Sequence, residues 1–93
     1  MIQINHPRFD LGTIVATSNA LRQLPQYEIQ RALARHRAGD WGDCCPEDAQ
    51  ANDAALSTGG RLLSVYHSAD QIRFWIITEA DRSSTTVLLP ADY

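Results

Sequence analysis

The sequence contains no lysine, so all eight basic residues are arginine. Eleven acidic residues outnumber them, and the formal net charge is −3. This mildly acidic balance disfavours nonspecific attraction to the phosphates of nucleic acid. The arginine-only composition fits two interpretations, selection for planar bidentate contacts or a compositional bias of the genome.

The sequence also lacks a long apolar run. No stretch approaches the ~18–20 apolar residues of a membrane span. Residues 1–10 have neither the charged nor the apolar region of a secretory leader. We therefore expect a cytoplasmic protein without membrane contact. Ninety-three residues, 44% of them apolar, fit one domain over residues 1–93, with 1–10 as an arm or edge strand.

Cysteine is scarce, and the two that occur, Cys44 and Cys45, are adjacent. Neighbouring thiols cannot staple a fold, and they lack the spacing that lets two zinc ligands converge. At a helix start the dipole would favour a Cys45 thiolate, but Asp43, Glu47 and Asp48 oppose it. No glycine-rich phosphate loop occurs. We therefore predict free thiols, no metal and no cofactor.

Periodicity and turn residues predict an α+β fold in the order β-α-α-β-β-β. We expect a three- to four-stranded, mainly antiparallel sheet with two to three helices on one face. Phe74–Ile77 is four large apolar residues in a row, which is typical of a central strand covered on both faces. The predicted strands are 11–16, 61–67, 71–78 and 84–89, and the predicted helices are 17–24, 26–37 and one from Pro46 to Gly59.

Polar residues gather in the loop after the predicted central strand. Glu79 and Asp81 are two positions apart and share a face of an extended segment, so each would perturb the other's proton affinity. Arg82 beside them could hold an anionic substrate. With His36 or His67, this loop would suit a small hydrolase or lyase. In the alternative interpretation, Arg82 neutralises its neighbours in an ordinary polar loop.

A second candidate lies between two predicted helices. His36 falls on the apolar stripe of the helix over 26–37, so we expect a buried ring bonded to Asp40 or to a backbone carbonyl. Trp41 in the following turn is expected to fill the core. Together the Asp40–Trp41 turn and the Glu79–Arg82 loop form the predicted binding surface.

Arginines and aromatic residues alternate along the predicted sheet. Arg61, Arg73 and Arg82 lie on or beside it, together with Tyr66 and Trp75. Such a surface can stack single-stranded nucleic acid. The sequence lacks the signature of an RNA-recognition motif and has a negative net charge, which disfavours this interpretation.

Four segments within residues 11–93 carry a resemblance: HRAGDWGD, NDAAL, GGRLLSVYH and FWIITEADRSSTTVLLPADY. They resemble a family of short proteins carried on bacterial plasmids, integrative elements and phages. Some members bear the label of a type I restriction endonuclease subunit M, but such a subunit needs several times this length and a cofactor-binding loop. The resemblance implies a mobile-element accessory protein. A frequent role of such small proteins is to bind and block a host defence complex, as anti-restriction and anti-CRISPR proteins do.

The sequence thus favours a non-enzymatic protein-binding module over an enzyme. Its expected partner is a host protein or complex. Two alternatives stay open. One is a hydrolase or lyase built on Glu79, Asp81, Arg82 and His36. The other is a homodimer that pairs an exposed edge strand.

Overall fold

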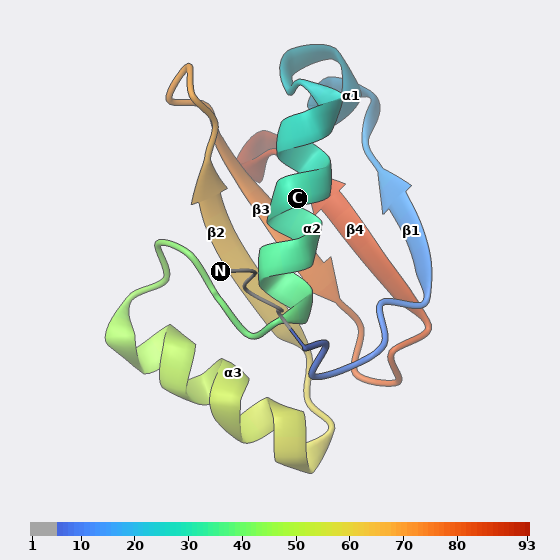
Figure 1. Ribbon diagram of the computed structural model, residues 1–93, viewed down its shortest axis with the longest axis vertical. Coiled ribbons are helices and arrows are strands. Elements are labelled where there is room, and N and C mark those ends of the chain that lie inside the picture. The colour runs from blue at the N-terminus through green and yellow to red at the C-terminus, as the bar shows by residue number, and fades with distance from the viewer. Residues whose placement is uncertain (1–5) are drawn as a thin grey trace, which may run out of the picture.

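The structure, a computed structural model, describes residues 6–93, so the strand or arm predicted over residues 1–5 lies outside it. It confirms the α+β class with four strands and three α-helices (Figure 1). No helix in this range is long and apolar enough to cross a membrane. The elements are β1 (Thr13–Ala16), α1 (Ser18–Gln23), α2 (Gln26–Arg37), α3 (Pro46–Thr58), β2 (Leu62–His67), β3 (Arg73–Thr78), β4 (Ser84–Leu88) and the 3-10 turn η1 (Pro90–Asp92).

The four strands form one sheet in the order β1-β4-β3-β2. β2, β3 and β4 are an antiparallel meander, whereas β1 runs parallel to β4. The first strand therefore joins the last, and the two edges of the sheet are β1 and β2. All three predicted helices are present, so the observed order β-α-α-α-β-β-β has one more helix than the predicted order β-α-α-β-β-β lists.

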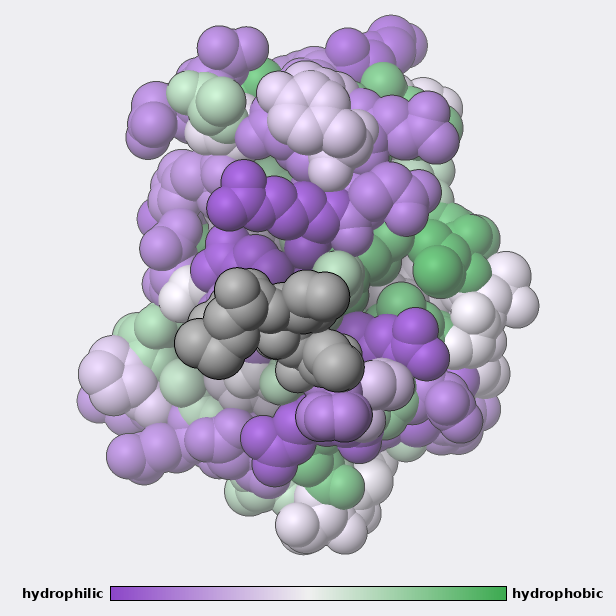
Figure 2. All heavy atoms as spheres, viewed as in Figure 1, coloured by the Kyte–Doolittle hydropathy of each residue, from purple (hydrophilic) through white to green (hydrophobic). Residues whose placement is uncertain are grey.

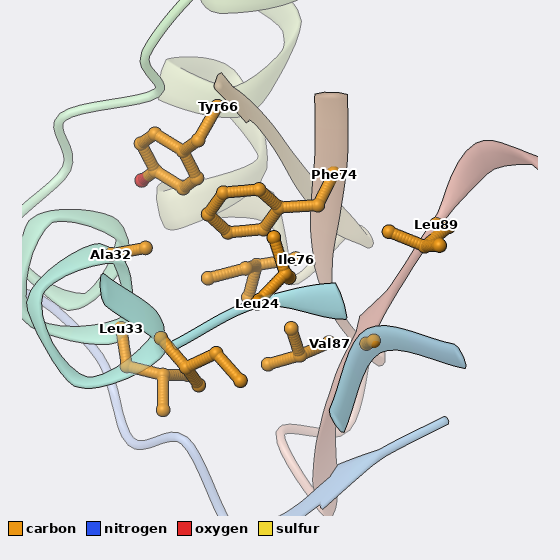
Figure 3. Close-up of a cluster of buried hydrophobic side chains, with 10 residues drawn as sticks. Leu24, Ala32, Leu33, Tyr66, Phe74, Ile76, Val87 and Leu89 are labelled. Atoms are coloured by element: carbon orange, nitrogen blue, oxygen red, sulfur yellow. The ribbon is translucent and has the colours of Figure 1, made fainter. Parts of the chain in front are cut away.

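Helix α2 begins and ends where the sequence predicts. Pro25 precedes its first residue, and Gly39, with φ of +84°, follows its last turn. Its apolar stripe is buried on the sheet, as Figure 3 shows for Leu33 and its neighbours. This main cluster comprises Ala20, Leu24, Ile29, Ala32, Leu33, Tyr66, Phe74, Ile76, Val87 and Leu89.

Helix α3 lies beside the β2 end of the sheet, while α2 crosses the face of the sheet (Figure 1). It contributes to a second, smaller cluster of Trp41, Ala55 and Leu62. The helix opens at Pro46, and it ends at Gly59, whose φ of +85° ordinary residues avoid. The second cluster attaches α3 to β2.

The sheet face opposite α2 carries aromatic side chains in place of a helix. Trp75 meets Tyr93 edge to face at 5.7 Å between ring centroids, and the Arg61 guanidinium lies 5.6 Å from the Tyr93 ring. Ile77 is buried on this face, while Trp75 is half-buried. The strand over Phe74–Ile77 is central, as predicted. Its face opposite α2 is covered only by a few side chains and not by a helix.

Candidate functional site

Arg82, predicted as a binding anchor, is occupied within the fold. Its Nη1 donates to the carbonyl oxygens of Gly60 at 2.6 Å and Glu79 at 3.2 Å, and Nη2 donates to that of Ala55 at 3.0 Å. Nη1 also lies 3.3 Å from the Ala80 carbonyl. Ala55 lies in the last turn of α3, where its carbonyl also accepts the Gly59 N–H, and Gly60 follows the helix. Arg82 therefore caps α3 and holds it to the β3–β4 loop.

The two carboxylates of that loop do not form an acid–base pair. Glu79 lies 3.5 Å from the Arg61 guanidinium. Asp81 accepts the backbone N–H of Ser83 at 3.0 Å. The Ser83 hydroxyl and this N–H lower the pKa of Asp81, because both stabilise its charged form. A general acid needs the opposite shift.

Asp40 is likewise engaged with its own helix. Arg35 donates to it from Nε at 2.7 Å and from Nη2 at 3.2 Å, and Gly42 donates its backbone N–H at 3.1 Å. These bonds, that of Arg35 first, lower the pKa of Asp40. The Arg35 guanidinium also lies 4.7 Å above the Tyr66 ring. The pair fixes the turn after α2, although both side chains keep solvent contact.

Trp41 was predicted both to fill the core and to belong to the binding surface. The structure places it in the core, so it is not an exposed contact residue. Its side chain is only 6% exposed. The indole Nε1 donates to Asp53 on α3 at 2.9 Å. Its ring stacks with Phe9 at 6.3 Å and meets the His36 ring edge to face at 5.7 Å.

His36 is fully buried, but its partners are neither Asp40 nor a backbone carbonyl. Nδ1 lies 2.5 Å from the Ser64 hydroxyl, and Nε2 lies 2.9 Å from that of Thr78. Thr78 contacts Thr85 at 2.7 Å, and Thr85 donates to the carbonyl of Leu11, also at 2.7 Å. These hydroxyls replace the expected partners because β2, β3 and β4 present them under α2.

The last hydrogen bond in this series of hydroxyls determines which atom donates in the bonds before it. The Thr85 hydroxyl donates its single hydrogen to the Leu11 carbonyl, so Thr78 must donate to Thr85. Thr78 then accepts from Nε2–H of His36. Burial first, and the nearby charge of Arg82 second, lower the pKa of His36 to about 4. The ring is therefore neutral at pH 7, and its Nδ1 accepts from the Ser64 hydroxyl.

Phe9 contacts several of the predicted site residues, although no sequence pattern pointed to it. Its ring meets His36 edge to face at 5.2 Å, stacks on Trp41, and lies 5.7 Å from the Arg82 guanidinium. His36, Trp41 and Arg82 therefore do meet in space. Their polar atoms are bonded to other protein groups, which makes this a structural junction.

The thiols show no convergent ligands. Cys44 donates to the carbonyl of Leu63 at 3.3 Å, and burial raises its pKa, which disfavours a thiolate. Cys45 is exposed and precedes α3. Over residues 6–93, no three His, Cys, Asp or Glu side chains are placed to hold a metal ion.

A groove of about 290 Å³ lies between α2 and the β2–β3 hairpin, with charged groups along it. His67 contacts Asp43 at 2.5 Å, and Glu28 accepts the Ala69 N–H at 2.8 Å. Arg35 is paired with Asp40. Arg31 also lines the groove, so its charged lining residues are Glu28, Arg31 and Arg35.

The β2 edge of the sheet is closed by the chain itself. Asn52 on α3 donates to the Leu63 carbonyl at 2.7 Å and accepts the Leu63 N–H at 3.1 Å. One pleat further on, Val65 donates to the Trp41 carbonyl at 3.1 Å and accepts from Asp43 N–H at 2.7 Å. The outward backbone groups of both residues thus have partners.

The β1 edge, by contrast, is open. Thr13 and Thr17 donate to carbonyls of Ser83 and Val87, both at 3.0 Å, so odd-numbered residues face β4. Ile14 and Ala16 then direct their N–H and C=O groups away from the sheet. No other strand of the described chain pairs there. The segment Thr13–Ala16 also has no charge or proline of the kind that protects edges.

An apolar groove adjoins this open edge. Figure 2 shows apolar side chains at the right of the molecule, where Figure 1 places β1. Ile14 is 50% exposed, Val15 46% and Leu21 62%. The groove has a volume of about 360 Å³. Its lining contains no charged residue and consists of Ile14, Val15, Ala16, Leu21, Leu24, Gln26, Ile29, Gln30, Leu33 and Val87.

No family model matches the chain, and comparison with curated proteins and with solved structures finds no match. The resemblance to proteins of plasmids, integrative elements and phages therefore stays a prediction. The geometry of the open edge and its groove is the remaining guide to function.

Proposed function

We propose that this protein is a non-enzymatic protein-binding module that takes an extended, uncharged polypeptide segment onto the β1 edge. The observation that carries the proposal is the contrast between the two edges. Asn52 and the 41–43 turn close β2, whereas the outward backbone groups of Ile14 and Ala16 have no partner within residues 6–93 and lie beside an apolar groove. An added strand would satisfy those groups and seat alternate side chains in the groove.

The contacts made by the residues once considered catalytic support this proposal over a hydrolase or lyase. Arg82 is committed to carbonyl oxygens, and His36 lies in a closed chain of hydroxyls. Asp81 has a lowered pKa rather than the raised one of a general acid. We therefore place the contact surface on β1, and not on the Asp40–Trp41 turn and the Glu79–Arg82 loop that the sequence predicted.

The resemblance noted above suggests a host defence complex as the first foreign partner to test. Affinity capture from host lysate should compare the wild type with Ile14→Lys and with Ala54→Lys. Ile14 points into the groove region, whereas Ala54 is exposed on α3. A strand partner should be lost with Ile14→Lys and kept with Ala54→Lys, because lysine hinders edge pairing.

Two results would contradict the proposal. One is a captured protein that binds Ile14→Lys as well as it binds the wild type. The other is a wild-type protein whose β1 edge binds neither a foreign protein nor a second copy of the chain at any concentration. Circular dichroism and thermal unfolding establish that each variant is folded.

A further inference from the structure

We propose that the segment seated on the β1 edge is β1 of a second copy, so that two chains form one continuous antiparallel sheet. This inference rests on the proposed function and names its partner. Three features support it: the direction of the free backbone groups, the side chains beside them, and the closed edge at the other end of the sheet.

Symmetry restricts the register. A two-fold axis perpendicular to the sheet keeps each side chain on its own face of the sheet. The numbers of two paired residues must therefore both be even or both be odd. With Val15 on the axis, Ile14 faces Ala16 of the second copy. Each such pair exchanges two backbone hydrogen bonds, which satisfies every outward N–H and C=O of the strand.

The other short register is poorer. With Ile14 on the axis, Ala16 would face Gly12 of the second copy. Gly12 has a φ of +65°, outside the extended range, and its position is packed against the backbone of Ser83. The Ala16 groups would then remain unpaired, which favours the register centred on Val15.

The side chains fit the same register. On the groove side, the half-exposed Ile14 lies opposite the small Ala16, which lines the partner's groove next to Leu21. On the opposite face, Val15 meets its own symmetry mate in a non-hydrogen-bonded pair, the closer type of pair. Each Ile14 thereby enters the apolar groove of the other copy.

Charge and topology also suit a second copy. The chain carries 19 charged residues, yet none lines the groove, so two copies meet there without burying charge. Because Asn52 and residues 41–43 close the β2 edge, pairing through β1 stops at two chains and cannot extend into a fibre.

Site-specific cross-linking tests the register. In a Cys44→Ser, Cys45→Ser background, Val15→Cys should form an interchain disulfide under mild oxidation, because its symmetry mate lies within the Cα separation that disulfides span. Thr13→Cys is the matched control. It lies on the same face of the same strand but faces Thr17 of the second copy, so it should cross-link far less.

Native mass spectrometry and light scattering test the dimer itself. The wild type and Ile14→Val should be dimers. Ile14→Pro should be a folded monomer, because it removes an outward N–H and leaves the ladder to β4 intact. A wild type that stays monomeric up to about 1 mM, where even weak specific contacts are populated, overturns the dimer. So does cross-linking of Thr13→Cys that equals that of Val15→Cys.

The two proposals fail in different ways. If the wild type is monomeric but captures a foreign protein that Ile14→Lys loses, the dimer is wrong and the binding edge stands. If the wild type is monomeric and capture ignores the Ile14 change, both are wrong. Ile14→Val, which keeps the N–H, separates loss of pairing from loss of fold.

Discussion

The side-chain amide of Asn52 makes two hydrogen bonds with the backbone of Leu63, donating at 2.7 Å and accepting at 3.1 Å. An amide side chain has the same donor and acceptor as a peptide group, so Asn52 stands in for one residue of a neighbouring strand. This contact attaches α3 to β2 and closes that edge of the sheet. The difference between the two edges, and with it the proposed function, depends on this contact.

Replacing Asn52 by leucine should lower the free energy of unfolding by about 1–3 kcal/mol, because the Leu63 N–H loses its partner and the Leu63 carbonyl keeps only the weak Cys44 thiol donor. Urea unfolding measures the change. Gln50→Leu, at an exposed position of the same helix, is the control and should stay within about 0.5 kcal/mol of the wild type. Equal effects of the two changes would show that the Asn52 contact does not close the edge.

Replacing Arg82 by alanine should lower the free energy of unfolding by about 2–4 kcal/mol, because Arg82 makes charge-assisted bonds to the end of α3. Arg82→Lys should recover little of this loss, since an ammonium cannot reproduce the planar fork. Arg61→Ala serves as the control, because its ion pair with Glu79 is exposed. An Arg82→Ala protein as stable as Arg61→Ala would restore Arg82 as a free surface residue.

Stability should fall between pH 7 and pH 5 because of His36. Its pKa is about 4 in the folded protein and about 6.5 when unfolded, so only the unfolded chain gains a proton in this range. The free energy of unfolding should drop by about 2 kcal/mol from pH 7 to pH 5, and the loss is complete below the folded pKa.

Denaturant unfolding at the two pH values checks this slope. His36→Gln, which cannot titrate, should remove most of the slope even though the variant is less stable overall. His67→Gln changes an exposed histidine and should keep it. A slope that persists in His36→Gln and disappears in His67→Gln would mean that the buried ring is not the titrating group.

Local signals in the sequence were sufficient for the helices. The bounds of α2 follow from Pro25, the apolar stripe and Gly39, all within one short stretch. The start and end of α3 follow in the same way from Pro46 and Gly59. The central position of Phe74–Ile77 was also readable, because a continuous apolar run needs burial.

The proposed binding edge could not be predicted from the sequence, because it depends on pairings between distant residues. Arg82 bonds carbonyls 22 and 27 positions away, and His36 bonds hydroxyls 28 and 42 positions away. The parallel pairing of β1 with β4 makes β1 an edge, and no local pattern reveals that arrangement. Exposed Ile14 and Val15 look like ordinary strand residues until the strand order is known.

Backbone amide exchange at Ile14 and Ala16, followed by NMR, tests the central claim most directly. The account predicts slow exchange at these two amides when the protein is concentrated and fast exchange when it is dilute. Thr13, which donates to Ser83 within the fold, should show no such dependence. Fast exchange at Ile14 and Ala16 at every concentration, and also in the presence of a captured partner, would contradict binding at the β1 edge.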